Sequence, residues 1–428
     1  MITHELIERI EGEAALDFQT DDKGAVEEVN IRFFHFRGME AIMEGRSALD
    51  ALVITPRVCG ICGHSHLIAA VRMLESLYRS AGHEAALSPK AESIRRITLQ
   101  CEVLQSHFKW LYLTMLPESA KLIGGESISA LKALYAASQA NAVAALFSGQ
   151  WPHSAYAQPG GVTCDPTHVD VIRARSILSE IIRFMEDEVL GCGVERFESV
   201  RRIDELLALA GDAGELLRNV EKAGLLEEGK SYGRFLILGE GTMIDESGEH
   251  AALAECVSEA LPYTPHGASH AKNALYDGRF FESGPLARSL ARQDGVVAAL
   301  VRTFGDSAAS RIAARIAEMV VIVQEIRALL EALDLAEPSF IPPTPIELLS
   351  GEGTGIVEAP RGSLIHKAAF EKGKILSYSI ITPTQWNLGN GTPESPGVAQ
   401  KAMMGSQSRE KAAFLFRTFD VCSVCTTH

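Results

Sequence analysis

The sequence contains no uncharged apolar run of about 18 residues, the length that a membrane-spanning helix requires. Residues 1–5 (MITHE) carry neither a basic nor an apolar region, so we expect no signal peptide on this chain. Positive charge is also in deficit, because 40 Lys and Arg stand against 55 Asp and Glu and give a formal net charge of −15. That balance argues against nucleic acid and against an anionic membrane surface as partners.

Cysteine is sparse, with eight residues in 428, and half of them occur singly. An isolated cysteine is more often a small buried hydrophobe than a ligand. The single cysteines are Cys101, Cys164, Cys192 and Cys256. An iron–sulfur cluster needs several thiolates together, so the chain has no candidate for one outside its two cysteine pairs.

The hydrophobic pattern predicts a fold that is mainly α with small β elements (α+β). Alternation at 25–33 predicts strands within an N-terminal segment of about 1–55. Apolar residues at three- and four-residue spacing predict a helical core over about 67–335, in which 311–335 is a long amphipathic helix. Residues from about 336 to 428 form a loop-rich segment with short strands.

Hydrophobic residues make up 46% of the chain, which is enough to bury a large core. We find no internal repeat and no low-complexity tract. We therefore expect residues 1–428 to form a single large domain, with a central bundle of long helices and short strands near both ends. The last helix is predicted at about 396–416.

Two CxxC pairs stand near opposite ends of the chain, and each is followed by a histidine. The first lies in RVCGICGHSH (residues 57–66), and the second lies in DVCSVCTTH (residues 420–428). Four thiolates in two such turns make a soft, four-sulfur metal site. Since roughly 360 residues separate the pairs, the fold must bring both ends of the chain together for them to share one metal.

Other uses of paired cysteines fit the spacing less well. Zinc ribbons place the second pair about 15–20 residues after the first, although a structural zinc site of wider span stays open. A redox-active CxxC near a βαβ unit would indicate thioredoxin-like chemistry, but two pairs with trailing histidines match it poorly. Surface disulfides are weaker still, because nothing else in the chain indicates secretion.

Together the two motifs resemble RxCGxCxxxH and DxCxxCxxH of the large, catalytic subunit of [NiFe]-hydrogenases, and the likeness extends over nearly the whole chain. The resemblance implies that the four paired cysteines hold nickel, namely Cys59, Cys62, Cys422 and Cys425. The second cysteine of each pair would bridge to an iron that carries CO and cyanide. His66 would donate a hydrogen bond to a bridging sulfur, whereas read alone it is a core histidine. Val421 replaces the proline that is usual before the first cysteine of this motif.

Two further motifs resemble the family near the N-terminus. Arg9-Ile10-Glu11-Gly12 implies that Glu11 is the first proton acceptor outside the metal site, since a carboxylate within hydrogen-bond reach of a thiolate can relay a proton. Glu40, in Arg37-Gly38-Met39-Glu40, would bind a structural magnesium ion together with the Ile380 carbonyl and the His428 ring. Without the resemblance, Glu11 would be a turn residue and Glu40 a surface acid.

The segments EAPRG (358–362) and TPTQWN (382–387) match another pair of family motifs. Arg361 would lie over the cyanides and the open nickel position, where a planar guanidinium donates to anionic ligands. Pro383 and Thr384 would line the same diatomic ligands. The alternative for Arg361 is an ordinary salt bridge, for example with Asp420.

The resemblance implies reversible heterolytic cleavage of H2, with the proton passing to a terminal thiolate, Cys422, and on to Glu11. The electrons require a small subunit with iron–sulfur clusters, in a higher oligomer of heterodimers, and we expect that subunit to decide whether the complex is cytoplasmic or membrane-associated. A hydrogen-sensing regulatory hydrogenase and a structural zinc-thiolate subunit of a redox complex stay open. A degenerate relative, such as the quinone-site subunit of respiratory complex I, is disfavoured by the presence of all four cysteines.

Overall fold

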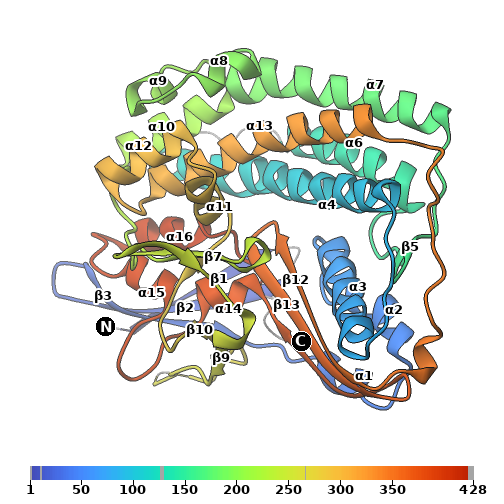
Figure 1. The fold of residues 1–428 in the computed structure, drawn as a ribbon. Coiled ribbons are helices and arrows are strands. Elements are labelled where there is room, and N and C mark those ends of the chain that lie inside the picture. Colours follow the sequence, from blue (N-terminus) through green and yellow to red (C-terminus); the bar gives the residue numbers. More distant parts are fainter. Residues whose placement is uncertain (1, 10–11, 126–129, 266, 423–428) are drawn as a thin grey trace.

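The computed structural model describes residues 2–9, 12–125, 130–265 and 267–422. In this part of the chain, antiparallel sheets formed near both ends of the sequence are combined with long helices from its middle (Figure 1). The fold is α+β, as the sequence predicts. None of the described helices is both long and apolar enough to cross a bilayer.

The N-terminal sheet is a meander of β1 (Ile2–Arg9), β2 (Gly12–Thr20) and β3 (Val26–Phe33). The tight turn before β3 forms because the Asp21 carboxylate accepts the backbone N–H groups of Lys23 and Ala25, both at 2.8 Å. Along β3, alternate side chains such as Val29, Ile31 and Phe33 are buried. The alternation at 25–33 thus forms a strand, as predicted.

The outer edge of β3 is covered by residues from the far end of the chain. The Val26 N–H donates to Ser406 O at 2.9 Å, and Gly405 N–H donates to Val26 O at 2.8 Å. Further along, the Ile31 N–H donates to Asn390 Oδ1 at 2.7 Å. These bonds satisfy backbone groups that an open sheet edge would leave exposed.

Four long helices lie beside one another in the upper part of Figure 1, and a fifth lies apart from them against the C-terminal sheet. The four are α4 (Pro89–Trp110), α6 (Leu131–Ser148), α7 (His168–Phe184) and α13 (Ala308–Ala332), and the fifth is α3 (Gly63–Ser80). Two of these helices begin at residues that are typical N-caps. Ser88 caps α4 ahead of a proline, and Thr167 caps α7 and forms a capping box with Asp170.

Shorter helices connect these elements. They are α1 (Met39–Met43), α2 (Ala51–Ile54), α5 (Leu116–Leu122), α8 (Val194–Glu198), α9 (Ile203–Leu207), α10 (Asp212–Lys222), α11 (Pro285–Ala291), α12 (Gly295–Phe304), α14 (Pro383–Leu388), α15 (Val398–Met403) and α16 (Arg409–Arg417). The single helix expected at 396–416 is therefore wrong, because the chain leaves the helical conformation between α15 and α16, where Gly405 has φ +85°.

The long helix expected at 311–335 forms as α13, but the expectation that it is amphipathic is wrong for its first half. Every residue from Ala308 to Val320 is buried, because the helix packs between α4, α7, α11 and α12. The charged residues on this stretch, Arg311, Arg315 and Glu318, are therefore inside the protein. Their spacing mimics the polar face of a surface helix.

The C-terminal segment is more regular than predicted. A three-stranded meander forms from β12 (Gly351–Ala359), β13 (Gly362–Glu371) and β14 (Lys374–Ile381), so the expected short strands are wrong in length.

Small β elements also occur in the middle of the chain, which was expected to be helical. They are β4 (Ala157–Gln158), β5 (Gly161–Val162), β6 (Phe235–Ile237), β7 (Thr242–Asp245), β8 (Gly248–Ala251), β9 (Val257–Ala260), β10 (Asn273–Tyr276) and β11 (Glu282–Ser283).

Helix α3 lies unusually close to β12 because that strand carries glycines where the two elements meet. A Cβ on Gly355 would collide with the Ala69 carbonyl oxygen, and one on Gly353 would collide with Met73 O. Omitting these side chains lets the helix backbone rest directly on the sheet.

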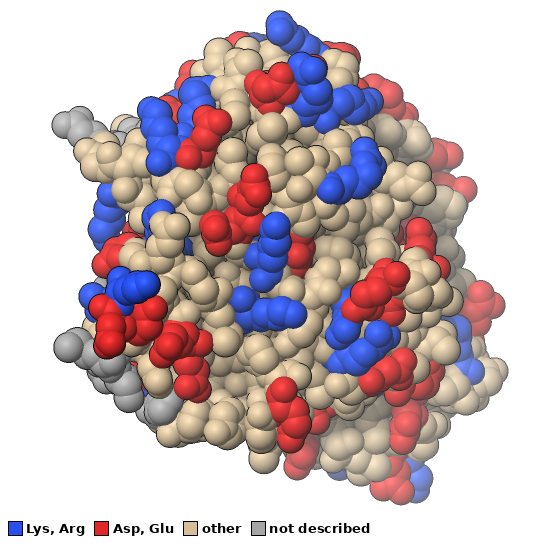
Figure 2. Space-filling model, turned by 90° about the vertical axis from the view of Figure 1, so that its left-hand side faces the viewer, with Lys and Arg blue, Asp and Glu red and all other residues tan. Residues whose placement is uncertain are grey.

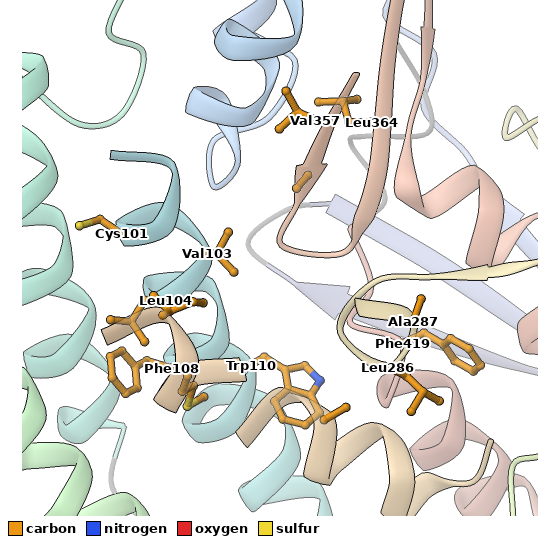
Figure 3. Packing of buried hydrophobic residues seen from close by; sticks show 14 of the residues in the cluster. Cys101, Val103, Leu104, Phe108, Trp110, Leu286, Ala287, Val357, Leu364 and Phe419 are labelled. Carbon is orange, nitrogen blue, oxygen red and sulfur yellow. The ribbon is translucent and has the colours of Figure 1, made fainter. Parts of the chain in front are cut away.

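The core joins these layers. Figure 3 shows part of it, with Leu104, Phe108 and Trp110 on α4, Val357 and Leu364 on the β12–β13 hairpin, and Phe419 near Leu286 and Ala287. Cys101 belongs to this core, as expected for a buried hydrophobe, whereas Cys164, Cys192 and Cys256 are only partly buried. On the face seen in Figure 2, acidic and basic side chains are interspersed and do not form a basic patch.

Candidate metal centre

The first cysteine pair occupies the loop that leads into α3. Cys59 and Cys62 are buried, and the backbone N–H groups of Ile61 and Cys62 both donate to Cys59 Sγ at 3.4 Å. Hydrogen bonds of this kind favour the thiolate form of a cysteine. The backbone of the loop therefore surrounds the Cys59 sulfur with donors that suit a metal ligand.

A carboxylate from α4 fixes the junction between this loop and α3. Glu102 accepts the N–H groups of His64 and Ser65 at 2.7 and 2.8 Å, and it also accepts the Ser65 hydroxyl at 2.7 Å. These are donors that the first turn of a helix leaves unpaired. Burial raises the pKa of Glu102 to about 7, although the hydrogen bonds from Ser65 and His64 oppose the shift.

Cys422 reaches the first pair from the other end of the sequence. Its side chain is fully buried, and its Sγ lies 3.6 Å from Cys59 Sγ, across 363 positions. Two sulfurs that bind one metal ion at about 2.3 Å each lie about 3.3–3.8 Å apart, so the observed separation suits shared coordination. Cys59, Ile61, Cys62 and Cys422 form one buried cluster.

Three of the predicted site residues, Glu11, Cys425 and His428, lie outside the described residues. Among those that are described, no group of three or more His, Cys, Asp or Glu side chains is placed to hold a metal ion. What the structure brings together is therefore one sulfur pair, with Cys62 in the same cluster.

Arg361 lies in the turn between β12 and β13 and is only 4% exposed. Its Nε donates to Asp420 O at 3.0 Å, and its Nη2 donates to Asp420 Oδ1 at 3.3 Å. Burial alone would lower the pKa of this guanidinium, but Asp420 and then the sulfurs of Cys422, Cys62 and Cys59 hold it well above its usual value. The salt bridge with Asp420 is thus present, and the same cation also acts on the cysteine cluster.

Two buried donors near this turn have no hydrogen-bond partner among the described residues. One is Arg361 Nη1 and the other is Thr384 Oγ1, in the first turn of α14. Pro383 and Thr384 are both buried there. The helix is tied to the turn, because Asn387 Nδ2 donates to Arg361 O at 3.2 Å. Since buried donors are rarely left unpaired, these atoms fit a site that holds a further acceptor.

Asp420 is held by a second arginine that the sequence did not indicate. Its Oδ2 lies 3.5 Å from Arg315 Nη1 of α13, and its backbone has φ +62°. Burial lowers the pKa of Arg315 to about 10 despite the attraction of Asp420. Arg315 Nη1 also lies 3.2 Å from His107 Nδ1.

This polar network extends away from the cysteines. His107 Nε2 lies 2.8 Å from Glu318 Oε2, and Glu318 receives both Nε and Nη2 of Arg288 at 2.7 Å. Glu318 also lines a cavity of about 420 Å³ between α4 and α13. The signal in the sequence was the set of charges spaced along one face of α13, which the amphipathic interpretation assigned to solvent.

His66 lies on the first turns of α3 and is buried. Its Nδ1 lies 3.0 Å from Nε2 of His366 on β13, and His366 Nδ1 lies 2.7 Å from the Tyr378 hydroxyl on β14. His66 therefore belongs to a buried chain of side chains with His366 and Tyr378. The partners were not predicted, because strand pairing and helix packing are not visible in a single sequence.

Glu40 and Ile380 are brought together as the resemblance implied, but the observed contact uses the backbone N–H. Ile380 N donates to Glu40 Oε1 at 2.7 Å. Burial raises the pKa of Glu40, while the Ile380 N–H and then Lys272 act in the opposite direction. Glu40 is half-buried, so it is not a plain surface acid.

A family model described as nickel-dependent hydrogenase matches residues 37–117 and 263–428, which is more than half of the chain. The chain belongs to the nickel-dependent hydrogenases. It is an oxidoreductase and a [NiFe]-hydrogenase large subunit, as the two cysteine motifs predicted. The matched ranges contain both cysteine pairs, Glu40 and Arg361.

Similar proteins cover nearly the whole hydrogenase chain. The alpha subunit of sulfhydrogenase 2 from Pyrococcus furiosus is 25% identical, over 98% of this chain and 97% of that one. The alpha subunit of coenzyme F420 hydrogenase from Methanothermobacter thermautotrophicus is 27% identical, over 98% and 93%. The solved Ni-Fe-Se hydrogenase of D. vulgaris Hildenborough in the reduced state shares the fold, with a TM-score of 0.82, 22% identity and full coverage of both chains.

Proposed function

We propose that this hydrogenase large subunit catalyses the reversible heterolytic cleavage of H2 at a nickel–iron centre held by Cys59, Cys62, Cys422 and Cys425. The observation that carries the proposal is the buried contact between Cys59 and Cys422, which joins the two motifs at a distance suited to one metal ion. Cys59, Cys62 and Cys422 are all closed off from solvent. Soft thiolates suit a nickel ion that changes its redox state.

The residues around the sulfurs fit the rest of such a centre. Cys62 and Cys425 would bridge to the iron, and Arg361 Nη1 and Thr384 Oγ1 would donate to its cyanide ligands, with Pro383 beside them. When bound, the metal pair supplies Lewis-acid polarisation of hydrogen. The positive charge of Arg361 would attract anionic sulfur ligands nearby, and the buried surroundings exclude water, which strengthens that attraction.

Proton transfer is assigned to residues of this chain. Cys422 is the proposed first acceptor, since it is a buried thiol next to Cys59 and within the field of Arg361. Glu11 would take the proton next, at a carboxylate suited to exchange with groups closer to solvent. His66 would remain a donor to a bridging sulfur.

A magnesium ion would be held by Glu40, the Ile380 carbonyl and the His428 ring. The contact between Glu40 and the Ile380 backbone supports this assignment, because it holds the carboxylate beside the Ile380 peptide. Carboxylate and carbonyl oxygens are the ligands that magnesium prefers.

Residues 1–428 would act as one catalytic domain with the long helices as its central bundle. Helices α4 and α13 support this view, because their side chains His107 and Arg315 lead directly to Asp420. The single cysteines are scattered, so the electrons would pass to a small subunit with iron–sulfur clusters. That subunit would set the compartment, and the heterodimers would associate further.

The deciding experiment is an infrared spectrum of the purified protein in the region of metal-bound CO and CN, with nickel, iron and zinc quantified on the same sample. One CO band, two CN bands and stoichiometric nickel support the centre. No such bands, together with stoichiometric zinc, would replace it with a structural zinc-thiolate site. Slow H2 turnover with a normal spectrum would indicate a hydrogen-sensing role.

A further inference from the structure

The Tyr378 hydroxyl carries one proton that needs an acceptor inside the protein. Tyr378 is only 6% exposed, and its sole hydrogen-bond partner among the described residues is His366 Nδ1, at 2.7 Å. A tyrosine hydroxyl is protonated at neutral pH, so it has one hydrogen to donate. Because a buried O–H without an acceptor is costly, the hydroxyl donates to His366 Nδ1.

This donation determines the protons of the next two rings. If His366 Nδ1 accepts, the proton of a neutral His366 is on Nε2. That Nε2–H faces His66 Nδ1 at 3.0 Å and must donate to it. The proton of a neutral His66 is then on Nε2, on the side of the ring away from His366.

We propose that Tyr378, acting through His366, holds His66 in the single tautomer that carries its proton on Nε2. Tyr378 and His366 are positioning residues: they make His66 a permanent donor, one that cannot accept a proton released at the centre. That the recipient of the Nε2–H bond is a cysteine sulfur rests on the proposed function, whereas the tautomer itself does not.

The sheet explains why these three side chains meet. Tyr378 pairs with Ala368, two positions from His366 along β13, so both rings lie on one face of the sheet within diagonal reach. On the other side of β13, His366 is paired with Gly355, whose missing side chain lets α3 approach. The helix thereby brings His66 onto His366.

The test is long-range ¹H–¹⁵N NMR of the full chain with ring-¹⁵N-labelled histidine, recorded before and after nickel loading. Signals of His66 and His366 are assigned by their loss in His66→Gln and His366→Gln. The expected spectrum shows an unprotonated Nδ1 and a protonated Nε2 for both rings, already in the metal-free chain. In Tyr378→Phe, both rings should lose this single tautomer and give shifts averaged between the two forms.

Tyr78→Phe is the matched control, because Tyr78 is also buried but donates to Thr344 O, away from these rings. It should leave the His66 signals unchanged. A proton on His66 Nδ1 in the unaltered protein would overturn the inference, and this result does not depend on whether Tyr378→Phe folds. Unchanged His66 signals in a folded Tyr378→Phe would overturn it too. If no metal centre forms and the Nε2–H tautomer is still seen, the proposed function fails while the inference is supported.

Discussion

Arg361 combines two tasks that one lysine cannot combine. Its Nε and Nη2 are occupied by Asp420, while Nη1 faces away from that carboxylate without a described partner. An ammonium group can replace the ion pair but not the planar fork. Arg361 therefore has a structural role, in its ion pair with Asp420, and a proposed catalytic role through Nη1.

We expect Arg361→Lys to lower the rate of H2 oxidation by about 10²–10³-fold, the usual effect of removing one well-placed donor. The nickel content should stay unchanged, because the cysteines are intact. Hydrogen uptake and nickel analysis on the same preparation measure both. Arg96→Lys, at the surface pair with Glu325, is the control and should retain activity. Near-normal turnover in Arg361→Lys would mean that the arginine has only a structural role.

Glu11→Gln should keep the metals but block the exit of protons, because an amide cannot carry the proton onward. H/D exchange between H2 and solvent should therefore fall much more than nickel content or the infrared bands. Glu13→Gln, on the neighbouring strand β2, serves as the control. Unchanged exchange in Glu11→Gln would remove Glu11 from the proton path.

At the scale of elements, the position of α3 depends on glycine in β12. We expect Gly355→Ala to destabilise the protein by about 1–3 kcal/mol, as overpacking does, because the new Cβ would collide with the backbone of α3 at Ala69. Urea unfolding measures the loss. Gly193→Ala is the control, since a Cβ there meets only the ordinary contacts of Glu195 and Glu186. Equal stabilities would show that α3 does not rest on the strand as described.

The Glu102 carboxylate, which accepts hydrogen bonds at the start of α3, makes the stability of the protein depend on pH. Its folded pKa is raised from 4.5 to about 7, so between these values the folded state binds more protons than the unfolded state. Its contribution to stability is complete below about 4.5 and is lost as the pH rises through 7. In Glu102→Gln, urea unfolding between pH 5 and 8 should show a weaker fall of stability with pH. Glu221→Gln, an exposed carboxylate on α10, should keep the original slope.

At the scale of the whole molecule, the proposed metal centre would connect the two ends of the chain. A ligand that binds only the folded state stabilises it by about 4 kcal/mol at 1,000 times its Kd, so nickel should raise the unfolding temperature of the complete protein. Cys422→Ser should abolish this gain together with nickel retention and H2 oxidation. Cys164→Ser, at a partly buried single cysteine, should keep all three. Full activity in Cys422→Ser would contradict the proposed ligand set.

The sequence was sufficient to name candidate site residues that belong to short motifs. The cysteine pairs could be named because their spacing sets them apart, whereas Arg361, Glu40 and Ile380 could be named only through the family resemblance. The residues that hold these site residues in position could not be named from the sequence. His366 and Tyr378 depend on strand register, and Glu102 acts on a different helix. Arg315 and Glu318 have the spacing of a solvent-facing stripe, although the first half of α13 is buried. Long-range packing decides each of these roles, and a single sequence does not record it.

The edge of β3 has a consequence for the order in which the protein can form during synthesis. Its backbone groups are completed by Asn390, Gly405 and Ser406, which leave the ribosome about 360 to 380 residues later. At about 5–20 residues per second, that delay is about 20–70 s. For this time the nascent N-terminal sheet presents an open strand that could pair with another chain. A chaperone that covers exposed strands would therefore protect β3 during this time.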